Sequence, residues 1–414
     1  MARLQIYNPT ERALVALADA ALAPIGWLGR VRRSFRRSKT RSGLRTDEYV
    51  GPSGLRTGEA DRRAGEPRKI LLLRLERIGD LLMVMDAIGD ARRAWPGADI
   101  DLAVGSWNAD LARLIPDVTR LQVADAPWLA RGAGASWRSL FSQARAWRRS
   151  RYDLVINFEP DIRSNLLAWL SGAPRRFGYW TGGGGPLLTS RSAYAPLSHV
   201  SDNARRLVAR AARREHVGSA DRPAGPRLVP PPEAVARATA ILGSASRPIV
   251  GVHVSGGRES KQWHLDRFAQ VARRLAAERG ATIVLTGSEA DRPMVDEVRA
   301  AMGATRVIDA AGALDLPSLA ALLGRLDVLV TGDTGPMHLA AAMGTPVVAL
   351  FGPSHVERYG PLAPRQRILR VDLPCSPCGQ VRLPPERCRG HVPDCMDGIQ
   401  VDAVVKAATE LLRA

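Results

Sequence analysis

The stretch between residues 326 and 351 constrains the fold of this chain more than any other. An apolar run at 326–330 precedes Thr-Gly-Asp-Thr-Gly-Pro-Met-His at 331–338, which leads through small residues to a second apolar run at 346–351. This order predicts a strand, a tight turn, a helix and a second strand. Two strands joined in this way lie parallel in one sheet, so the segment predicts a parallel sheet covered by helices.

The turn at 331–338 is also a candidate phosphate site. Thr334 or Asp333 can cap the helix, and Gly335 and Pro336 suit its first turn. A helix N-terminus at the carboxyl end of a parallel strand attracts anions through its N–H groups and its dipole. The segment therefore predicts a phosphorylated small ligand such as a nucleotide; the alternative is a well-capped helix without a ligand.

The size and composition of the chain predict a two-domain globular protein. It has 414 residues, of which 45% are hydrophobic and 24% charged. It lacks an apolar run long enough to predict a transmembrane helix. The first apolar run, 13–28, has no basic region before it and contains Asp19, so it does not match a signal peptide. We therefore expect a cytoplasmic protein.

The net charge of +18 predicts a polyanionic partner, unless it only reflects a solvated basic surface. Nucleic acid, an anionic membrane surface and an acidic substrate all fit that charge. A nucleic-acid-binding protein is disfavoured, because no motif of that class is present and only 5% of residues are aromatic. No specific nucleic acid is therefore expected as a partner.

Residues 1–67 look separate from the rest of the chain. Apolar residues lie on one face of a predicted helix, namely Leu14, Leu17, Ala21 and Leu28. Eight basic residues and no acid follow between Arg30 and Arg45, with aromatic and apolar residues interleaved. This pattern is typical of a helix that binds a membrane surface, here through residues 27–45; a disordered basic tail is the alternative. Residues 46–67 are predicted to be a flexible linker.

From Lys69 onward, predicted strands and helices alternate. In the first half we expect strands at 70–75, 99–104, 120–123 and 154–158, and helices at 81–95, 109–114, 137–149 and 203–212. In the second half we expect strands at 248–254, 282–285, 307–308, 327–331 and 346–351, and helices at 233–242, 264–279, 292–302 and 317–325. Gly182–Gly185 is predicted to be a flexible loop. The fold class is therefore α/β, with doubly wound parallel-sheet domains at 68–228 and 229–414 facing a cleft.

Several polar residues follow predicted strands and are candidates for chemistry. Asp80 comes after the first strand, where a carboxylate can act as a general base or can simply complement the helix dipole. The loop that opens the second domain offers the candidate phosphate-binding residues Ser255, Gly256, Arg258 and Lys261, unless it is only a solvated loop. Glu289 follows the next strand, where a carboxylate can bind ribose hydroxyls. His338 can hydrogen-bond a phosphate or pack in the core.

All four cysteines lie in the segment 375–395. They are Cys375, Cys378, Cys388 and Cys395. In a cytosolic chain, clustered cysteines favour a structural zinc site over disulfides, although only the first pair has C-x2-C spacing. Free or redox-active thiols are the alternative.

Taken in order, these features resemble glycosyltransferase family 9, the bacterial heptosyltransferase family. The matching segments are KILLLRLERIGD at 69–80, the Arg176-Phe-Gly178 turn, VHVSGGRESKQW at 252–263, the motif at 331–338 and FGP at 351–353. The cysteine cluster ending in Cys395-Met396 also looks like that of many members.

The resemblance implies a GT-B fold of two Rossmann-like domains, the first holding the acceptor and the second the nucleotide-sugar. It implies transfer of a heptose from ADP-heptose to the lipopolysaccharide inner core, with inversion and without a metal ion. The family base falls on Asp80 and the donor-phosphate lysine on Lys261. Its sugar- and phosphate-binding loop falls on Asp333, Thr334, Gly335 and His338, and its ribose-binding acid on Glu289. The implied partners are a nucleotide-sugar and an anionic lipid-linked saccharide at the inner face of the bacterial inner membrane.

The chain departs from the family pattern in three places. They are the basic extension before Lys69, Glu76-Arg77 before the Ile-Gly-Asp turn, and the Gly182–Gly185 run in the region expected to meet the acceptor. These departures concern the acceptor and the sugar more than the reaction class. A GT-B transferase using a UDP- or GDP-hexose for a surface polysaccharide or glycoprotein, and a non-catalytic sugar-nucleotide sensor, are the alternatives.

Overall fold

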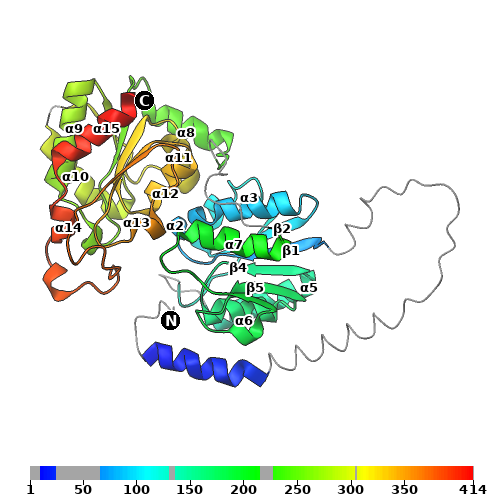
Figure 1. Ribbon diagram of the computed structural model, residues 1–414. Coiled ribbons are helices and arrows are strands. Elements are labelled where there is room, and N and C mark those ends of the chain that lie inside the picture. The colour runs from blue at the N-terminus through cyan, green and yellow to red at the C-terminus, as the bar shows by residue number, and fades with distance from the viewer. Residues whose placement is uncertain (1–9, 25–65, 130–135, 215–226, 304, 414) are drawn as a thin grey trace, which may run out of the picture.

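Two parallel sheets, each flanked by helices on both faces, make up the body of the protein (Figure 1). The computed structural model describes residues 10–24, 66–129, 136–214, 227–303 and 305–413. The first sheet is built from residues 69–192 and the second from residues 249–369. We call the part of the chain around each sheet the first and the second domain. The predicted α/β class with two doubly wound parallel sheets is confirmed.

The first sheet has the strand order β3-β2-β1-β4-β5-β6, and all neighbouring strands run parallel. Its strands are β1 (Lys69–Leu73), β2 (Asp99–Val104), β3 (Arg120–Val123), β4 (Leu154–Asn157), β5 (Arg175–Tyr179) and β6 (Ser190–Ser192). The central strand β1 pairs Leu72 with Leu102 on one side and Ile156 on the other. The central strands β1 and β4 read as nearly continuous apolar runs because helices cover both faces of the sheet.

The second sheet repeats this arrangement with the order β12-β11-β10-β7-β8-β9. Its strands are β7 (Ile249–His253), β8 (Thr282–Thr286), β9 (Val307–Asp309), β10 (Val328–Gly332), β11 (Val347–Leu350) and β12 (Gln366–Leu369). In each sheet the strand order reverses once, between β1 and β4 and between β7 and β10. Ligands of open parallel sheets bind outside the carboxyl ends of the strands at such a reversal.

The helices lie between the strands in sequence. They are α2 (Ile78–Met83), α3 (Met85–Ala94), α4 (Ala109–Ala112), α5 (Trp137–Ser150), α6 (Ile162–Leu170), α7 (Val200–Ala212), α8 (Pro232–Leu242), α9 (Leu265–Arg279), α10 (Arg292–Met302), α11 (Leu316–Leu323), α12 (Gly335–Ala342), α13 (Val356–Tyr359), α14 (Asp394–Asp397) and α15 (Val401–Arg413). The single helix predicted at 81–95 is divided at Val84 into α2 and α3. The segment Arg176-Phe-Gly178, predicted as a turn, lies in strand β5.

The Gly182–Gly185 run is a tightly packed segment, so the prediction of a flexible loop was wrong. All four glycines are buried. A Cβ atom at Gly182 would lie 1.9 Å from the carbonyl oxygen of Pro160, and one at Gly184 would lie 2.8 Å from Cβ of Asn165. Gly183 and Gly184 also have positive φ angles, which glycine adopts without steric cost. The run therefore allows two backbone segments to approach closely beside α6.

A helix at residues 10–24 lies against the first domain (Figure 1). The basic segment 27–45, predicted to bind a membrane surface, and the predicted linker 46–67 fall largely outside the described residues. None of the helices in the described part of the chain has both the length and the apolar character that crossing a bilayer requires.

Candidate active site

The two reversal points meet where the N-termini of α2 and α12 touch. A Cβ atom built on Gly79 of α2 would lie 3.1 Å from Cδ2 of His338, and one on Gly335 of α12 would lie 3.5 Å from Cγ2 of Ile78. Helix α2 follows β1 and helix α12 follows β10, so each belongs to the reversal point of its own sheet. The fold thus brings the predicted base region and the predicted phosphate-binding turn together.

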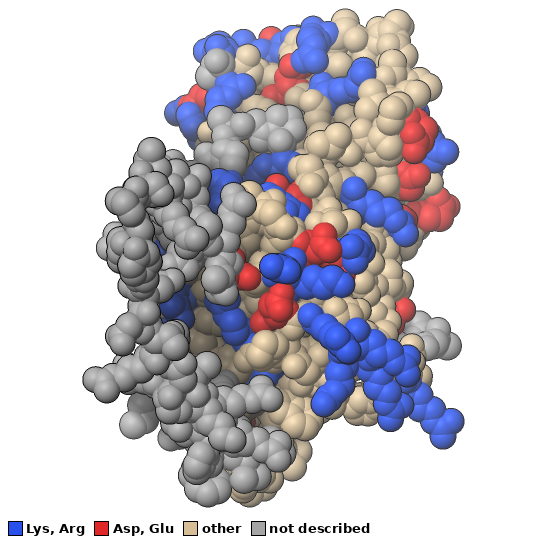
Figure 2. Space-filling model, turned by 90° about the vertical axis from the view of Figure 1, so that its right-hand side faces the viewer, with Lys and Arg blue, Asp and Glu red and all other residues tan. Residues whose placement is uncertain are grey.

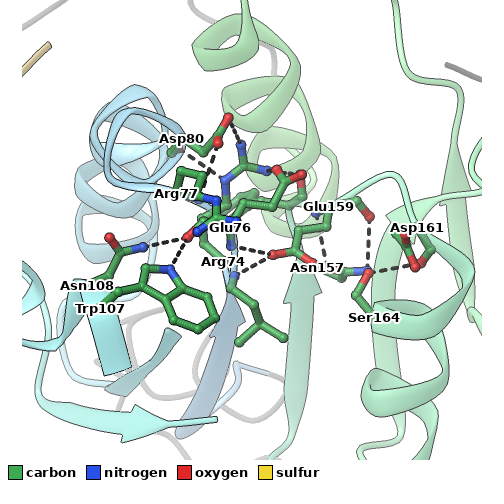
Figure 3. A network of polar contacts seen from close by, with 12 residues as sticks. Arg74, Glu76, Arg77, Asp80, Trp107, Asn108, Asn157, Glu159, Asp161 and Ser164 are labelled. Carbon is green, nitrogen blue, oxygen red and sulfur yellow. Dashed lines mark hydrogen bonds and ion pairs between the residues drawn. The ribbon is translucent and has the colours of Figure 1, made fainter. Parts of the chain in front are cut away.

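Asp80 is held by hydrogen bonds from its own loop (Figure 3). Nη2 of Arg74 donates to Oδ1 of Asp80 over 3.1 Å, and the backbone N–H of Arg77 donates to Oδ2 over 3.3 Å. The side chain of Asp80 is 27% exposed, whereas that of Arg74 is 3% exposed. The carboxylate therefore has a fixed orientation and still reaches solvent, as a proton acceptor for a bound substrate must.

Arg74 is fixed in turn by the end of strand β4. Its Nη1 donates to the carbonyl oxygen of Phe158 over 3.1 Å, and its Nε donates to the carbonyl oxygen of Asp80 over 3.1 Å. Its guanidinium also pairs with Glu76 at 3.1 Å. Burial opposes the charged form, but Glu76 and Asp80 outweigh it and raise the pKa of Arg74. Arg74 therefore remains a cation beneath Asp80.

Glu159 supports the same loop from the neighbouring strand. Its Oε1 accepts hydrogen bonds from the backbone N–H groups of Leu75 and Glu76. The backbone oxygen of Glu76 in turn accepts from Trp107 Nε1 and Asn108 Nδ2, at 2.8 and 2.7 Å. Burial, with Glu76 as the second cause, raises the pKa of Glu159 to about 8. Glu159 therefore holds the loop through backbone contacts and keeps a proton at neutral pH.

In the second domain, Lys261 lies against the motif that follows β10. Its Nζ donates to the backbone oxygen of Asp333 and is 3.2 Å from Oδ2 of the same residue. His338, on the first turn of α12, is 7% exposed. Burial lowers its pKa to about 4, and the charges of Asp333, Asp80 and Lys261 also act on it. A neutral imidazole thus sits among the predicted base, the predicted phosphate lysine and Asp333.

The loop after β7 is shaped for close backbone approach. The N–H of Gly256 donates to Oε1 of Gln262 over 2.8 Å, and a Cβ at Gly256 would lie 2.7 Å from the backbone of Lys261. Ser255 is buried and hydrogen-bonds to Asp291, whereas Arg258 is exposed. This folded-back loop presents Lys261 towards α12 and leaves Arg258 at the surface.

Thr334 is the N-cap residue of α12, as predicted, but its hydroxyl is not bonded to the helix N–H groups. It lies 3.1 Å from the hydroxyl of Thr331 instead. Gly335 and Pro336 occupy the first turn. Because the N-cap side chain leaves the first N–H groups of α12 unengaged, the helix N-terminus is suited to accept an anion.

Glu289 follows the carboxyl end of β8, which pairs with β7 and is two strands from β10, the strand before Asp333. Its side chain is 80% exposed, and one carboxylate oxygen is 4.0 Å from Arg292. The carboxylate occupies the space that a Cβ on Gly312 would need. Glu289 therefore lies at the rim of the site, in a position open to a ligand.

The structure thus brings Asp80, Lys261, Asp333 and His338 together and places Arg258 and Glu289 at the edge. Sequence reasoning missed Arg74 and Glu159. Both are polar residues that directly follow buried strands, which is the signal that identified Asp80 and could have identified them too.

The four cysteines are all free thiols in the segment that precedes α15. Cys395 is buried in α14, and burial raises its pKa to about 11. Among the described residues, no group of three or more His, Cys, Asp or Glu side chains is arranged to hold a metal ion. The zinc site at Cys375, Cys378, Cys388 and Cys395 stays a prediction.

Comparison with known proteins gives consistent matches across most of the chain. The family model for glycosyltransferase family 9 (heptosyltransferase) matches residues 140–385, a range that includes Lys261 and His338 but begins after Asp80. A lipooligosaccharide heptosyltransferase 2 from Haemophilus influenzae is 26% identical over 324 residues, which cover 73% of this chain and 88% of the relative.

Solved structures of similar proteins share the fold. The crystal structure of a family 9 glycosyltransferase from Veillonella parvula matches with a TM-score of 0.70 and 25% identity, covering 84% of this chain and 97% of that one. ADP-heptose lipopolysaccharide heptosyltransferase II from E. coli matches with a TM-score of 0.66 and 22% identity, covering 83% of this chain and 98% of that one.

Proposed function

The chain belongs to glycosyltransferase family 9, and from that premise we propose that it transfers a heptose from ADP-heptose to the inner core of lipopolysaccharide. The reaction is an inverting displacement that needs no metal ion. The observation that carries the proposal is the meeting of the two reversal points, where Asp80 of the first domain faces Lys261, Asp333 and His338 of the second. An acceptor hydroxyl and a donor diphosphate bound on these two sides would have their reacting atoms next to each other.

Asp80 is the proposed general base. Its carboxylate accepts the proton of the acceptor hydroxyl while that oxygen forms a bond to the anomeric carbon of the heptose. The bond between the anomeric carbon and the β-phosphate oxygen breaks on the opposite face, and ADP leaves with the electron pair. Arg74 and the backbone N–H of Arg77 hold the two carboxylate oxygens, so Asp80 is oriented before the substrate arrives.

The second domain supplies positive charge for the departing diphosphate. Lys261, which is now paired with Asp333, gains a stronger partner when a diphosphate binds between them. The backbone N–H groups of Thr334 and Gly335 lie at the N-terminus of α12, where the helix dipole is positive, and would face the diphosphate beside Lys261. These groups take the part that a divalent cation plays in other transferases, so we propose a reaction without one.

His338 and Glu289 are proposed to orient the donor. His338 is neutral at physiological pH because burial lowers its pKa to about 4, so it can donate one hydrogen bond to a sugar or phosphate oxygen without adding charge. The exposed carboxylate of Glu289 follows β8, where acids bind ribose hydroxyls in other doubly wound sheets. Ser255, Gly256 and Arg258 line the loop between these two positions.

The names of the relatives support the proposed substrates. The E. coli relative is named for ADP-heptose, and the relative from Haemophilus influenzae for lipooligosaccharide. An inner-core acceptor is anionic and lipid-linked, which suits a chain with a net charge of +18. We therefore place the enzyme at the cytoplasmic face of the inner membrane, in peripheral contact with it.

Replacement of Asp80 tests the proposed base. Asp80→Asn keeps the shape of the side chain, and we expect transfer to fall by about 10²–10⁴-fold. ADP binding, measured by calorimetry, should be unchanged, whereas Lys261→Ala should weaken it. The control is Asp110→Asn, an exposed helix acid paired with Arg113. Transfer by Asp80→Asn at the wild-type rate would remove Asp80 as the base.

The nucleotide is tested by thermal shift with ADP, UDP, GDP and CDP. A ligand that binds only the folded state raises the melting temperature. We expect ADP alone to do so. A selective shift with UDP or GDP would contradict an ADP-heptose donor and point to a transferase for another sugar.

A further inference from the structure

The helix at residues 10–24 is held on the first domain by a face that combines apolar side chains with one acid, Asp19. Oδ1 of Asp19 accepts a hydrogen bond of 2.5 Å from the backbone N–H of Gly184. Cγ1 of Val15 would lie 2.4 Å from a Cβ on Gly183, so only glycine leaves room for it there. The charge of Glu11 acts on Arg163, and that of Arg191 acts on Asp19. Val15, Ala18, Asp19 and Leu22 are half-buried and thus form the inward face.

The outward face of this helix also carries large apolar residues. Leu14 is 60% exposed and Leu17 is 69% exposed. Ala21, one turn further on the same face, is also exposed. A surface helix of a protein surrounded only by water places polar residues on its outward face. Here leucines lie on the outward face as well as on the inward one, so the exposed leucines require a separate explanation.

An aromatic residue adds to this apolar surface. Trp180 is 48% exposed and lies at the start of the glycine segment on which the helix sits, with its Cβ 3.0 Å from a Cβ position on Gly185. Tryptophan is enriched where proteins meet the interface of a bilayer, because its ring is apolar and its N–H is polar. Trp180 is therefore an exposed aromatic residue next to the segment on which the helix sits.

Charge identifies the occupant of this surface. The sequence between Arg30 and Arg45, which follows the helix closely, has eight basic residues and no acid. Lysine and arginine side chains are also more widespread than acidic ones on the face shown in Figure 2. Apolar residues combined with such basic charge match an anionic phospholipid surface. Two leucines are too few for a stable protein interface, which buries about 800 Å² per partner.

We propose that the helix at 10–24 lays Leu14 and Leu17, with Trp180 beside them, into the interfacial region of an anionic phospholipid bilayer. Glu11, at the N-terminal end of the helix, acts on the charge of Arg163 in the first turn of α6. This turn follows the carboxyl end of β4, and Asp80 lies at the same edge of the first sheet. The bilayer contact thus places the acceptor side of the site near the membrane. The inference rests on the proposed function only for the identity of the lipid-linked acceptor.

The test is co-sedimentation of the full chain with vesicles of phosphatidylglycerol and phosphatidylethanolamine at 0.15 M salt. The variant Leu14→Gln/Leu17→Gln removes apolar surface without changing charge and keeps a good helix former at both positions. We expect it to bind the vesicles at least about tenfold more weakly than the parent chain. The matched control Leu197→Gln/Leu383→Gln, at leucines that are 74% and 73% exposed, should bind like the parent.

Three results would overturn the inference. The first is equal vesicle binding by parent and variant. The second is vesicle binding that 0.5 M salt abolishes and that Leu14→Gln/Leu17→Gln does not change. Such binding would depend on basic charge alone. The third is a dimer in analytical ultracentrifugation that the glutamines dissociate, because a second copy would then cover the leucines. The vesicle assay contains no sugar donor, so its outcome does not depend on the proposed function. Absence of transfer by the parent chain to a water-soluble acceptor would count against the proposed function alone.

Discussion

At the scale of single residues, the base region depends on a buried cation. Arg74 is 3% exposed, and the carboxylates of Glu76 and Asp80 pair with its guanidinium. A guanidinium offers five donors in one plane, so Arg74 can bond to Asp80 and to the backbone of Phe158 at the same time. A lysine could not make both contacts, because its charge is a single point.

Glu159 gives this region a dependence on pH. Its pKa is about 8 in the folded chain against an ordinary value of 4.5, so between these values the folded state binds more protons than the unfolded state. The contribution of Glu159 to the free energy of unfolding therefore falls as the pH rises from about 5 to about 8. Glu159→Gln, whose amide oxygen can accept the same N–H groups, should flatten this decline when melting temperature is measured against pH.

The acid side of the same profile provides the control. Burial lowers the pKa values of His253 and His338 to about 4, so the unfolded state gains protons first as the pH falls below 6.5. Parent and Glu159→Gln should share this histidine contribution between about pH 6.5 and pH 4, so only the contribution of Glu159 distinguishes the two profiles. A variant that keeps the full decline between pH 5 and pH 8 would show that another group causes it.

At the scale of elements, the turn from β4 to α6 and the glycine segment 182–185 support each other. Asn165 of α6 donates from Nδ2 to the backbone oxygens of Tyr179 and Gly183, at 2.9 and 2.7 Å. Ser164 donates to the backbone oxygen of Asp161 over 2.9 Å and accepts from Asn157. The turn that carries Glu159 is therefore fixed from two sides, and Figure 3 shows its polar contacts.

Gly182→Ala should disrupt this arrangement. The new Cβ would lie 1.9 Å from the carbonyl oxygen of Pro160, so the backbone of one segment must move. We expect a loss of stability of about 1–3 kcal/mol or more in chemical denaturation. Gly97→Ala is the matched control, since no atom lies within 4 Å of its Cβ position. Equal stability of the two variants would contradict the tight packing described for this segment.

At the scale of the whole molecule, contacts join the two domains on several sides of the site. Nε2 of His199 lies 3.0 Å from the backbone oxygen of Gly360, and the guanidinium of Arg358 lies 5.6 Å from the ring centre of Tyr194. The backbone N–H of Arg227 donates to Ala342 of α12 over 2.8 Å. These contacts keep α2 and α12 next to each other.

Arg227 makes a second connection, through its side chain, to Asp86 of α3. The two are 2.5 Å apart, and Asp86 is buried and also accepts from Ser201 over 3.1 Å. Removal of one partner from a buried pair costs about 3–5 kcal/mol, because the other charge stays buried. Arg227→Ala should therefore lower the melting temperature, and Asp86→Asn in the same chain should recover part of the loss. No recovery would mean that Arg227 acts only through its backbone.

The local sequence was sufficient for the elements whose signal is local. The apolar runs that became β1, β4, β7 and β10 and the helix that became α9 appear where they were predicted, because burial on both sheet faces demands uninterrupted apolar residues. The same signal placed Asp80, Lys261 and the 331–338 motif at strand ends. Those positions lie on one edge of a parallel sheet whatever the other details of the fold.

Only the tertiary structure decided which of these strand ends face each other. Arg74 bonds to the backbone of Phe158 across a chain separation of 84 residues, and no local pattern reveals that Glu159 keeps a proton. Glycine permits both a flexible loop and the close approach of two backbone segments, and the sequence does not distinguish between them. The contacts of the glycine run with Pro160 and Val15 show that it serves close approach. The amphipathic pattern of residues 10–24 predicted a helix, but the contact of Asp19 with Gly184 determines that Leu14 and Leu17 face outward.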